Sequence, residues 1–151
     1  MNVVRSALLP YSASDMYRVV ADIESYPQFI KFCTGADIIS RDGDITVAKV
    51  HIEYSKLNIQ FTTRNQNFPG RLIKMEKVDG PFIVLQGEWR FDALTDSACK
   101  VSVEMNFDFD NNVANTVLGP VFKKTIAMQL QAFQNRAEQL YAGQGSEAEN
   151  A

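Results

Sequence analysis

The stretch CKVSVEMNFDFDNNVANTVLGPVFKKTIAMQLQAFQNRAEQLY, residues 99–141, contains the change of period that decides the fold. From Cys99 to Phe109 every second residue is apolar, which predicts a strand with one face on a core and the other in water. After Phe109 the apolar residues recur at steps of three or four, as along one face of an α-helix: Leu118, Phe122, Ile126, Leu130, Phe133, Ala137 and Leu140. A half-buried strand therefore leads into a long amphipathic helix.

The region before this stretch is divided by short turn signals. They predict consecutive antiparallel strands, and they are Asp42-Gly43-Asp44, Pro69-Gly70, Asp79-Gly80-Pro81 and Thr95-Asp96-Ser97. Residues 2–9 form a further strand, and Ser12, with Asp15 three residues on, predicts the start of a helix. A second short helix is expected over residues 24–30, with Pro27 in its first turn.

The order is one strand, two short helices, six strands and one long helix, which predicts an α+β helix-grip fold. In this fold a curved antiparallel sheet of about seven strands holds the long helix across its concave face. We expect the helix to be capped among Asp110, Asn111 and Asn112, to break or kink at Gly119-Pro120, and to run on to about Tyr141. The space between helix and sheet is either filled by side chains or kept open as a cavity, and the pattern does not choose between the two.

Composition and charge bound the function classes. The chain has 151 residues, a net charge of −3 and a pI near 5.1, which is no basic footprint for DNA or another nucleic acid. Cys33 and Cys99 match neither a disulfide framework nor a metal pair. The sequence shows no secretory signal segment and no apolar run of the roughly 20 residues that span a bilayer. A cytoplasmic protein with reduced thiols is the prediction.

Catalytic constellations are absent from the pattern. His51, the single histidine, shares the polar face of its predicted strand with Lys49 and Glu53, so it is expected to be solvated rather than a base. Asp108 and Asp110 fit a solvated strand end and a helix cap better than a carboxylate pair. The sequence therefore predicts neither an enzyme, nor a metal site, nor a cofactor.

Five short motifs occur in order: YPQF at 26–29, FTTRN at 61–65, VDGPF at 78–82, GEWRF at 87–91 and QAFQNRAEQLY at 131–141. With the opening RSALLPYSASDMY they closely resemble the START-like family of coenzyme Q-binding proteins and bacterial RatA-type ribosome association toxins, also called oligoketide cyclase/lipid transport proteins. The resemblance covers about residues 2–142. We accordingly expect a single START-like domain at 1–142 and a disordered tail at 143–151.

The resemblance implies a helix-grip fold around a hydrophobic tunnel, without catalytic machinery. It implies a ubiquinone-like polyprenyl ligand and support of respiration. The toxin branch instead implies binding to the large ribosomal subunit, which blocks subunit joining, and a small antitoxin protein as a further possible partner.

The residues expected to line a ligand site are apolar, and they are Tyr26, Phe29, Phe32, Phe61, Phe82, Leu85, Trp89, Phe107, Val117, Leu118, Phe122 and Ile126. Arg64 and Asn65 are candidates for holding a polar head group, or else they pair with neighbouring strands, and both readings stay open.

Three hypotheses follow. The chain binds a hydrophobic small molecule; it binds the ribosome through local cations; or its aromatics fill the interior and leave no site. The candidate cations for RNA phosphates are Arg64, Arg71, Lys74, Lys77, Lys123 and Lys124.

Overall fold

The computed structural model describes the backbone of residues 1–150 and the side chains of residues 1–142. The tail predicted at 143–151 lies outside the fully described residues. The elements in chain order are β1 (Asn2–Leu9), α1 (Ala13–Ala21), η1 (Ile23–Ser25), α2 (Tyr26–Phe29), β2 (Cys33–Asp42), β3 (Ile45–Tyr54), β4 (Leu57–Phe68), β5 (Leu72–Asp79), β6 (Phe82–Thr95), β7 (Ala98–Phe109) and α3 (Asn112–Asn150).

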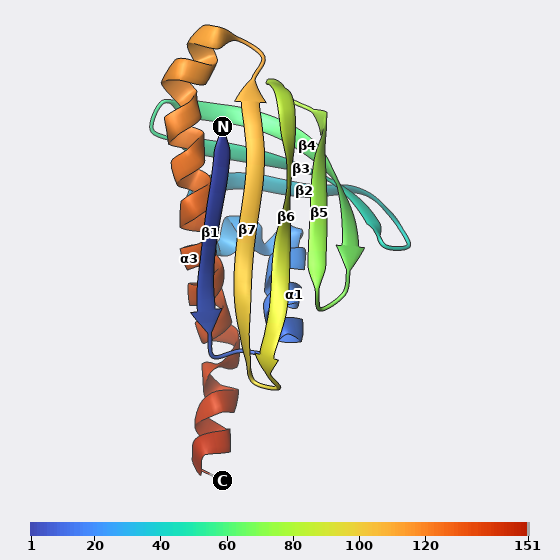
Figure 1. The fold of residues 1–151 in the computed structure, drawn as a ribbon, viewed down its shortest axis with the longest axis vertical. Helices are drawn as coiled ribbons and strands as arrows, with labels where there is room; N and C mark the ends of the chain where they lie inside the picture. Colours follow the sequence, from blue (N-terminus) through green and yellow to red (C-terminus); the bar gives the residue numbers. More distant parts are fainter. Residues whose placement is uncertain (151) are drawn as a thin grey trace.

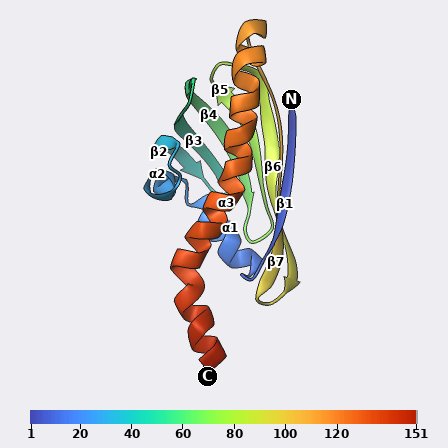
Figure 2. The same cartoon turned by 90° about the vertical axis from the view of Figure 1, so that its left-hand side faces the viewer.

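The strands form one antiparallel sheet of seven strands in the order β1-β7-β6-β5-β4-β3-β2. The sheet is strongly curved, and β2, β3 and β4 cross behind the face formed by β1, β7, β6 and β5 (Figure 1). Helix α3 lies along the inner side of the sheet, in front of the strands when the molecule is turned (Figure 2). The predicted helix-grip fold is confirmed.

Strand β7 shows the predicted alternation. Cys99, Val101, Val103, Met105, Phe107 and Phe109 are all buried, whereas the residues between them face the outer side of the sheet. The predicted turns also lie where the strands reverse. At one of them Gly80 has a φ of +135°, and a Cβ there would lie 2.8 Å from the Cβ of Phe61. Only glycine fits this turn without displacing β4.

Helix α1 begins as the sequence predicts, whereas the single helix expected over residues 24–30 is divided into η1 and α2. The Ser12 hydroxyl accepts a hydrogen bond from the backbone N–H of Asp15 at 3.0 Å, which caps α1. Pro27 lies in the first turn of α2, where a missing N–H leaves no helical hydrogen bond unmade. Both helices close the end of the sheet over which α3 passes, and their apolar side chains join the same core.

Helix α3 differs from its prediction at Gly119-Pro120 and at its end, since it runs to Asn150 rather than to about Tyr141. Asn111 caps it as expected, since its side-chain oxygen accepts hydrogen bonds from the N–H groups of Val113 (2.8 Å) and Ala114 (3.1 Å). Of the break or kink predicted at Gly119-Pro120, the break does not occur, because a single helix runs through both residues. Pro120 removes one helical hydrogen bond, but it is exposed, so water can solvate the carbonyl that is freed.

The inner face of α3 packs on the sheet through Phe122, Ile126, Phe133 and Ala137, all of them buried. The rings of Phe133 and Trp89 meet edge to face, with centroids 5.1 Å apart. Across the described part of the chain, no helix has the apolar length to cross a membrane.

Candidate functional site

A small cavity lies between α3 and the inner face of the sheet, and its volume is about 60 Å³. Strands β3 to β7 form its floor, α3 its roof, and η1 and α2 its side. Seven of the predicted site residues line it together: Tyr26, Phe61, Asn65, Leu85, Trp89, Phe122 and Ile126. Residues from four separate regions of the sequence thus converge on one enclosed space.

Aromatic side chains fill most of the space that the curved sheet leaves under α3. The Phe122 ring centroid lies 4.8 Å from that of Phe107 and 5.1 Å from that of Phe82. Phe61 and Phe109 complete this aromatic cluster around Phe122. A ligand pocket usually measures roughly 300–1,000 Å³, so the remaining cavity holds only a few water molecules. The expectation of an open tunnel is not met in this structure.

One end of the cavity is polar although it is buried. Asn65 is 4% exposed and Thr125 is 1% exposed. The Thr63 hydroxyl donates a hydrogen bond to the Asn65 side-chain oxygen at 2.8 Å, and the Thr125 hydroxyl donates to the carbonyl of Phe122 at 2.7 Å. Among the described side chains, no hydrogen bond engages the Asn65 amide nitrogen as donor, so that N–H group is left to the cavity.

Tyr26 is the one titratable side chain of the cavity wall. Its hydroxyl donates a hydrogen bond to the carbonyl of Val20, and its ring packs on Phe29 and Phe133. Burial raises the pKa of the Tyr26 phenol far above its usual value, with smaller contributions from Cys33 and Asp22. The phenol therefore stays neutral, and the wall carries no acid–base pair.

The other predicted lining residues lie elsewhere. Phe82 and Phe107 belong to the aromatic cluster beside the cavity, and Leu118 is half-buried on α3. Phe29 packs edge-on against Tyr26 and at a tilt against Phe133, while Phe32 packs against Tyr54. Val117 is exposed. These placements separate residues of the wall from residues that only support it.

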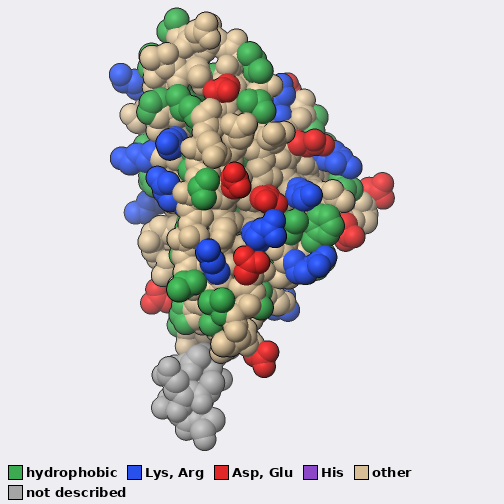
Figure 3. Space-filling model, viewed as in Figure 1, with side chains coloured by type: hydrophobic (Ala, Val, Ile, Leu, Met, Phe, Trp, Pro, Cys, Tyr) green, Lys and Arg blue, Asp and Glu red, His purple; other side chains and the backbone are tan. Residues whose placement is uncertain are grey.

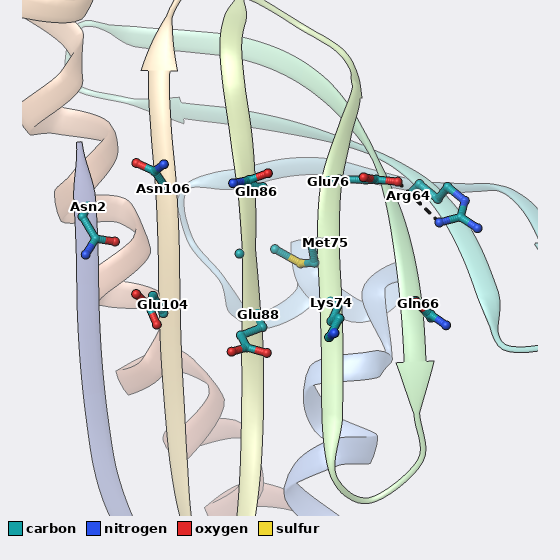
Figure 4. A pocket seen from close by; sticks show the side chains of 11 residues that line it. Asn2, Arg64, Gln66, Lys74, Met75, Glu76, Gln86, Glu88, Glu104 and Asn106 are labelled. Carbon is teal, nitrogen blue, oxygen red and sulfur yellow. Dashed lines mark hydrogen bonds and ion pairs between the residues drawn. The ribbon is translucent and has the colours of Figure 1, made fainter.

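Arg64 points to the opposite side of β4 from Asn65. Its guanidinium Nη1 lies 3.4 Å from Glu76 Oε1 on the outer face of the sheet. There it borders a shallow groove of about 810 Å³, in which Asn2, Gln66, Lys74, Gln86, Glu88, Glu104 and Asn106 also project outward (Figure 4). This groove is large, polar and open to solvent. Met75 is the one residue that lines both the groove and the cavity under α3.

The predicted cations do not gather into one patch. Arg64 and Lys74 lie on the outer face among three glutamates, where acidic and basic side chains alternate (Figure 3). Lys123 and Lys124 are on α3, on the other side of the sheet, and the Lys77 ammonium donates to the carbonyl of Phe82. A single RNA-binding surface built from all six residues is excluded by this arrangement.

The groups considered for catalysis stand apart from the cavity. His51 Nε2 lies 2.6 Å from Asn58 Oδ1 and 3.4 Å from Glu53 Oε1, on the outer side of β3. Asp108 accepts hydrogen bonds from the N-terminal ammonium and from Asn115, and the ammonium lowers the pKa of its carboxyl group. Both cysteines are buried and unpaired with each other.

Sequence reasoning missed nine residues of the wall: Ile23, Ala48, Val50, Ile52, Thr63, Met75, Met105, Thr125 and Gln129. Thr63 and Met105 could have been predicted from the sequence. Each lies two residues before a predicted site residue, Asn65 or Phe107, and therefore on the same face of its strand. Thr125 could not have been predicted, since a polar residue on the inner stripe of a helix carries no signal of its burial.

A family model described as polyketide cyclase/dehydrase and lipid transport matches residues 9–134. The ribosome association toxin RatA of Escherichia coli (strain K12) is 42% identical over 141 residues, which are 93% of this chain and 89% of that protein. The mitochondrial coenzyme Q-binding protein COQ10 of Drosophila melanogaster is 32% identical over 119 residues, which are 74% of this chain and 49% of that protein.

Among solved structures, the Zhui aromatase/cyclase from Streptomyces sp. R1128 superposes with a TM-score of 0.84 at 18% identity, covering 92% of this chain and 94% of that one. That likeness shows the shared fold alone. The description of the matching family names cyclases and dehydrases as well as lipid transport. The match over residues 9–134 and the similarity to RatA and COQ10 lead to one conclusion: this chain is a member of the polyketide cyclase/dehydrase and lipid transport family.

Proposed function

We propose that the chain is a cytoplasmic, non-enzymatic binding protein for a hydrophobic small molecule with an oxygen-bearing ring, of the ubiquinone class, and that it thereby supports respiration. The observation that carries the proposal is the buried Asn65 carboxamide, which offers an N–H donor at the polar end of a mostly apolar cavity. Such a donor orients a carbonyl or ether oxygen, while the apolar wall takes the rest of the ligand. The similarity to a coenzyme Q-binding protein supports the same ligand class.

The cavity must enlarge to admit such a ligand, and its wall contains side chains suited to that. Met75, Met105 and Gln129 are unbranched and have three rotatable bonds each. A polyprenyl chain that displaces them gains about 25 cal/mol for each Å² of apolar surface that it removes from water.

The lining argues for binding rather than catalysis. Tyr26 is its one titratable group, and burial raises the pKa of that phenol far out of the working range. General acid–base chemistry needs a group whose pKa lies near the working pH. The wall can therefore hold and orient a ligand but has no group to move its protons.

Trp89 supplies the test. It is the single tryptophan, it is 2% exposed, and it lines the cavity. Titration with decyl-ubiquinone should quench Trp89 fluorescence saturably, with one ligand per chain, whereas decanol, which lacks the ring, should not. Val50→Phe, which fills the cavity, should weaken the quenching; Val47→Phe, on the outer side of the same strand, should not. The proposal would be overturned by two results together. Decyl-ubiquinone would quench Trp89 linearly and without saturation in both variants, and solvent extracts of the purified protein would contain no lipid.

A second candidate function is association with the large ribosomal subunit and block of subunit joining. The observation in its favour is the similarity to RatA over 93% of the chain. Overproduction should then lower the 70S peak in sucrose gradients and place the protein in the 50S fractions. Unchanged profiles, with the protein at the top of the gradient, would remove this candidate without affecting the first. An antitoxin partner would be sought by co-purification under the same conditions.

A further inference from the structure

The solvent-facing side of the first half of α3 carries exposed apolar residues beside Asn112, Thr116 and two lysines, where a surface helix is ordinarily polar throughout. Val113, Val117, Pro120 and Lys124 follow one another at steps of four, three and four residues, and all four are exposed. Val113 is 72% exposed and Val117 is 48% exposed. We call these four residues, with Lys123, the α3 ridge; in Figure 2 no other element lies in front of this half of α3.

The charge of the helix contrasts with that of the chain. Between Asn112 and Ala137 the ionisable residues are Lys123, Lys124 and Arg136, with no Asp or Glu, although the chain as a whole carries −3. The ion pairs of the described side chains involve neither lysine of the ridge. The Lys124 ammonium lies 5.7 Å from the centre of the Tyr54 ring, at the margin of the helix. Both positive charges are thus free for an anionic partner.

A partner that fits this ridge must offer anionic groups and an apolar phase side by side. The surface of an anionic lipid bilayer does so: the headgroups attract lysines, and the boundary of the acyl chains accepts valine side chains. The RNA backbone offers phosphates alone and would leave Val113 and Val117 in water. The combination therefore favours lipid over nucleic acid.

The ridge and the cavity share one helical segment. Phe122 and Ile126 line the cavity from the inner side of the same turns that carry Pro120, Lys123 and Lys124 on the outer side. The cavity of about 60 Å³ is too small for a lipid, so this roof has to shift before a ligand enters. Gly119 and Pro120 weaken the helix within the roof, through backbone freedom and a missing hydrogen bond.

We propose that the α3 ridge docks the protein on an anionic lipid surface, from which the ligand reaches the cavity. The second clause rests on the proposed function, whereas the docking itself does not. Removing a lysine should weaken binding to anionic vesicles about fivefold, because a basic residue near such a surface contributes about 1 kcal/mol. Replacing both valines with serine should weaken it further and independently of salt.

The experiment is co-sedimentation of the full chain with vesicles of phosphatidylcholine alone or with 30% (about one lipid in three) phosphatidylglycerol. The wild type should bind the anionic vesicles, and the binding should fall with added salt. Val113→Ser/Val117→Ser and Lys123→Gln/Lys124→Gln should each lose most of it. The matched controls Val4→Ser and Lys74→Gln, on the outer face of the sheet, should bind as the wild type does.

Absence of wild-type binding to anionic vesicles, or equal loss in the outer-face controls, would overturn the docking proposal. So would ribosome pelleting that depends on both lysines but not on the valines, since it would assign the ridge to RNA. Decyl-ubiquinone quenching of Trp89 without vesicles is measured in parallel. Vesicle binding without quenching refutes the proposed function but supports the docking proposal. Quenching without vesicle binding supports the proposed function but refutes the docking proposal.

Discussion

Arg64 and Asn65 are neighbours in β4, yet their side chains serve opposite faces of the sheet. The Asn65 carboxamide is buried in the cavity under α3, where it accepts a hydrogen bond from Thr63 at 2.8 Å. The Arg64 guanidinium lies outside and pairs with Glu76 at 3.4 Å. The two head-group candidates are therefore not a unit, and only Asn65 can reach a ligand in the interior.

The first prediction uses this pair. Asn65→Ala should weaken decyl-ubiquinone binding about fivefold to tenfold, because the ligand oxygen loses one buried hydrogen bond. Arg64→Ala should leave the affinity within about twofold, since an exposed ion pair contributes little. Trp89 quenching measures both. Equal affinities for the two variants, with both folded by circular dichroism, would show that the ligand does not use the interior carboxamide.

The second prediction concerns the aromatic cluster. Phe122→Ala should lower the free energy of unfolding by about 3–5 kcal/mol, because the ring is buried against Phe61, Phe82, Phe107 and Phe109. Val113→Ala, on the exposed side of the same helix, should change it by less than about 0.5 kcal/mol. Urea denaturation followed by far-ultraviolet circular dichroism gives both values. A loss below 1 kcal/mol (about the mean for any point mutant) for Phe122→Ala would mean that α3 is not packed as described.

The third prediction concerns Gly87, in the middle of β6. A Cβ at this position would lie 2.2 Å from the carbonyl oxygen of Glu104 and 2.8 Å from the Cα of Met105, so β6 and β7 cannot keep their present approach with a side chain there. Gly87→Ala should lower the melting temperature by about 4–10 °C, as expected for an overpacked core site.

Gly43 is the matched control for Gly87. Its φ is +57° and no atom lies within 4 Å of a Cβ built there, so Gly43→Asn meets open space in a conformation that asparagine tolerates. Its melting temperature should stay close to that of the wild type. If the two variants melted together, the close approach of β6 to β7 would not be a constraint on the fold.

Much of the fold was predictable because the signals that define it are local. The alternation of β7, the glycine turns and the Ser12 cap each follow from a few neighbouring residues. Whether the space under α3 is open or filled was not predictable from the sequence. It depends on how Phe122 packs against rings from β4, β6 and β7, which are far apart in the chain and meet only in the folded protein. Val117 was expected to line the site, yet it is exposed, because it lies on the side of α3 that faces away from the sheet.

The fourth prediction concerns the two thiols. Cys33 and Cys99 are buried, and burial raises the pKa of each thiol, so the reactive thiolate is scarce and shielded. In the native protein both thiols should react with a thiol reagent such as DTNB at least about 100-fold more slowly than in urea. The rate in the native protein is then set by the opening of the fold that exposes them. Rapid labelling of one thiol under native conditions would identify a mobile region near that residue.

The fifth prediction concerns alkaline pH. Burial holds the pKa of Tyr26 far above that of a tyrosine in the unfolded chain, which is about 10. The phenol then keeps its proton in the folded protein while the unfolded chain loses it, so the stability that Tyr26 contributes is complete below pH 10 and falls as the pH rises above it.

Tyr26→Phe should cost about 1 kcal/mol at pH 7, because the hydrogen bond to Val20 is lost, and should show a flatter decline between pH 10 and 11.5 than the wild type. Urea midpoints measured across this range decide the matter, with Tyr11→Phe as the control nearer the surface. Parallel declines for the wild type and Tyr26→Phe would mean that this phenol meets water, and that the wall of the cavity is open beside it.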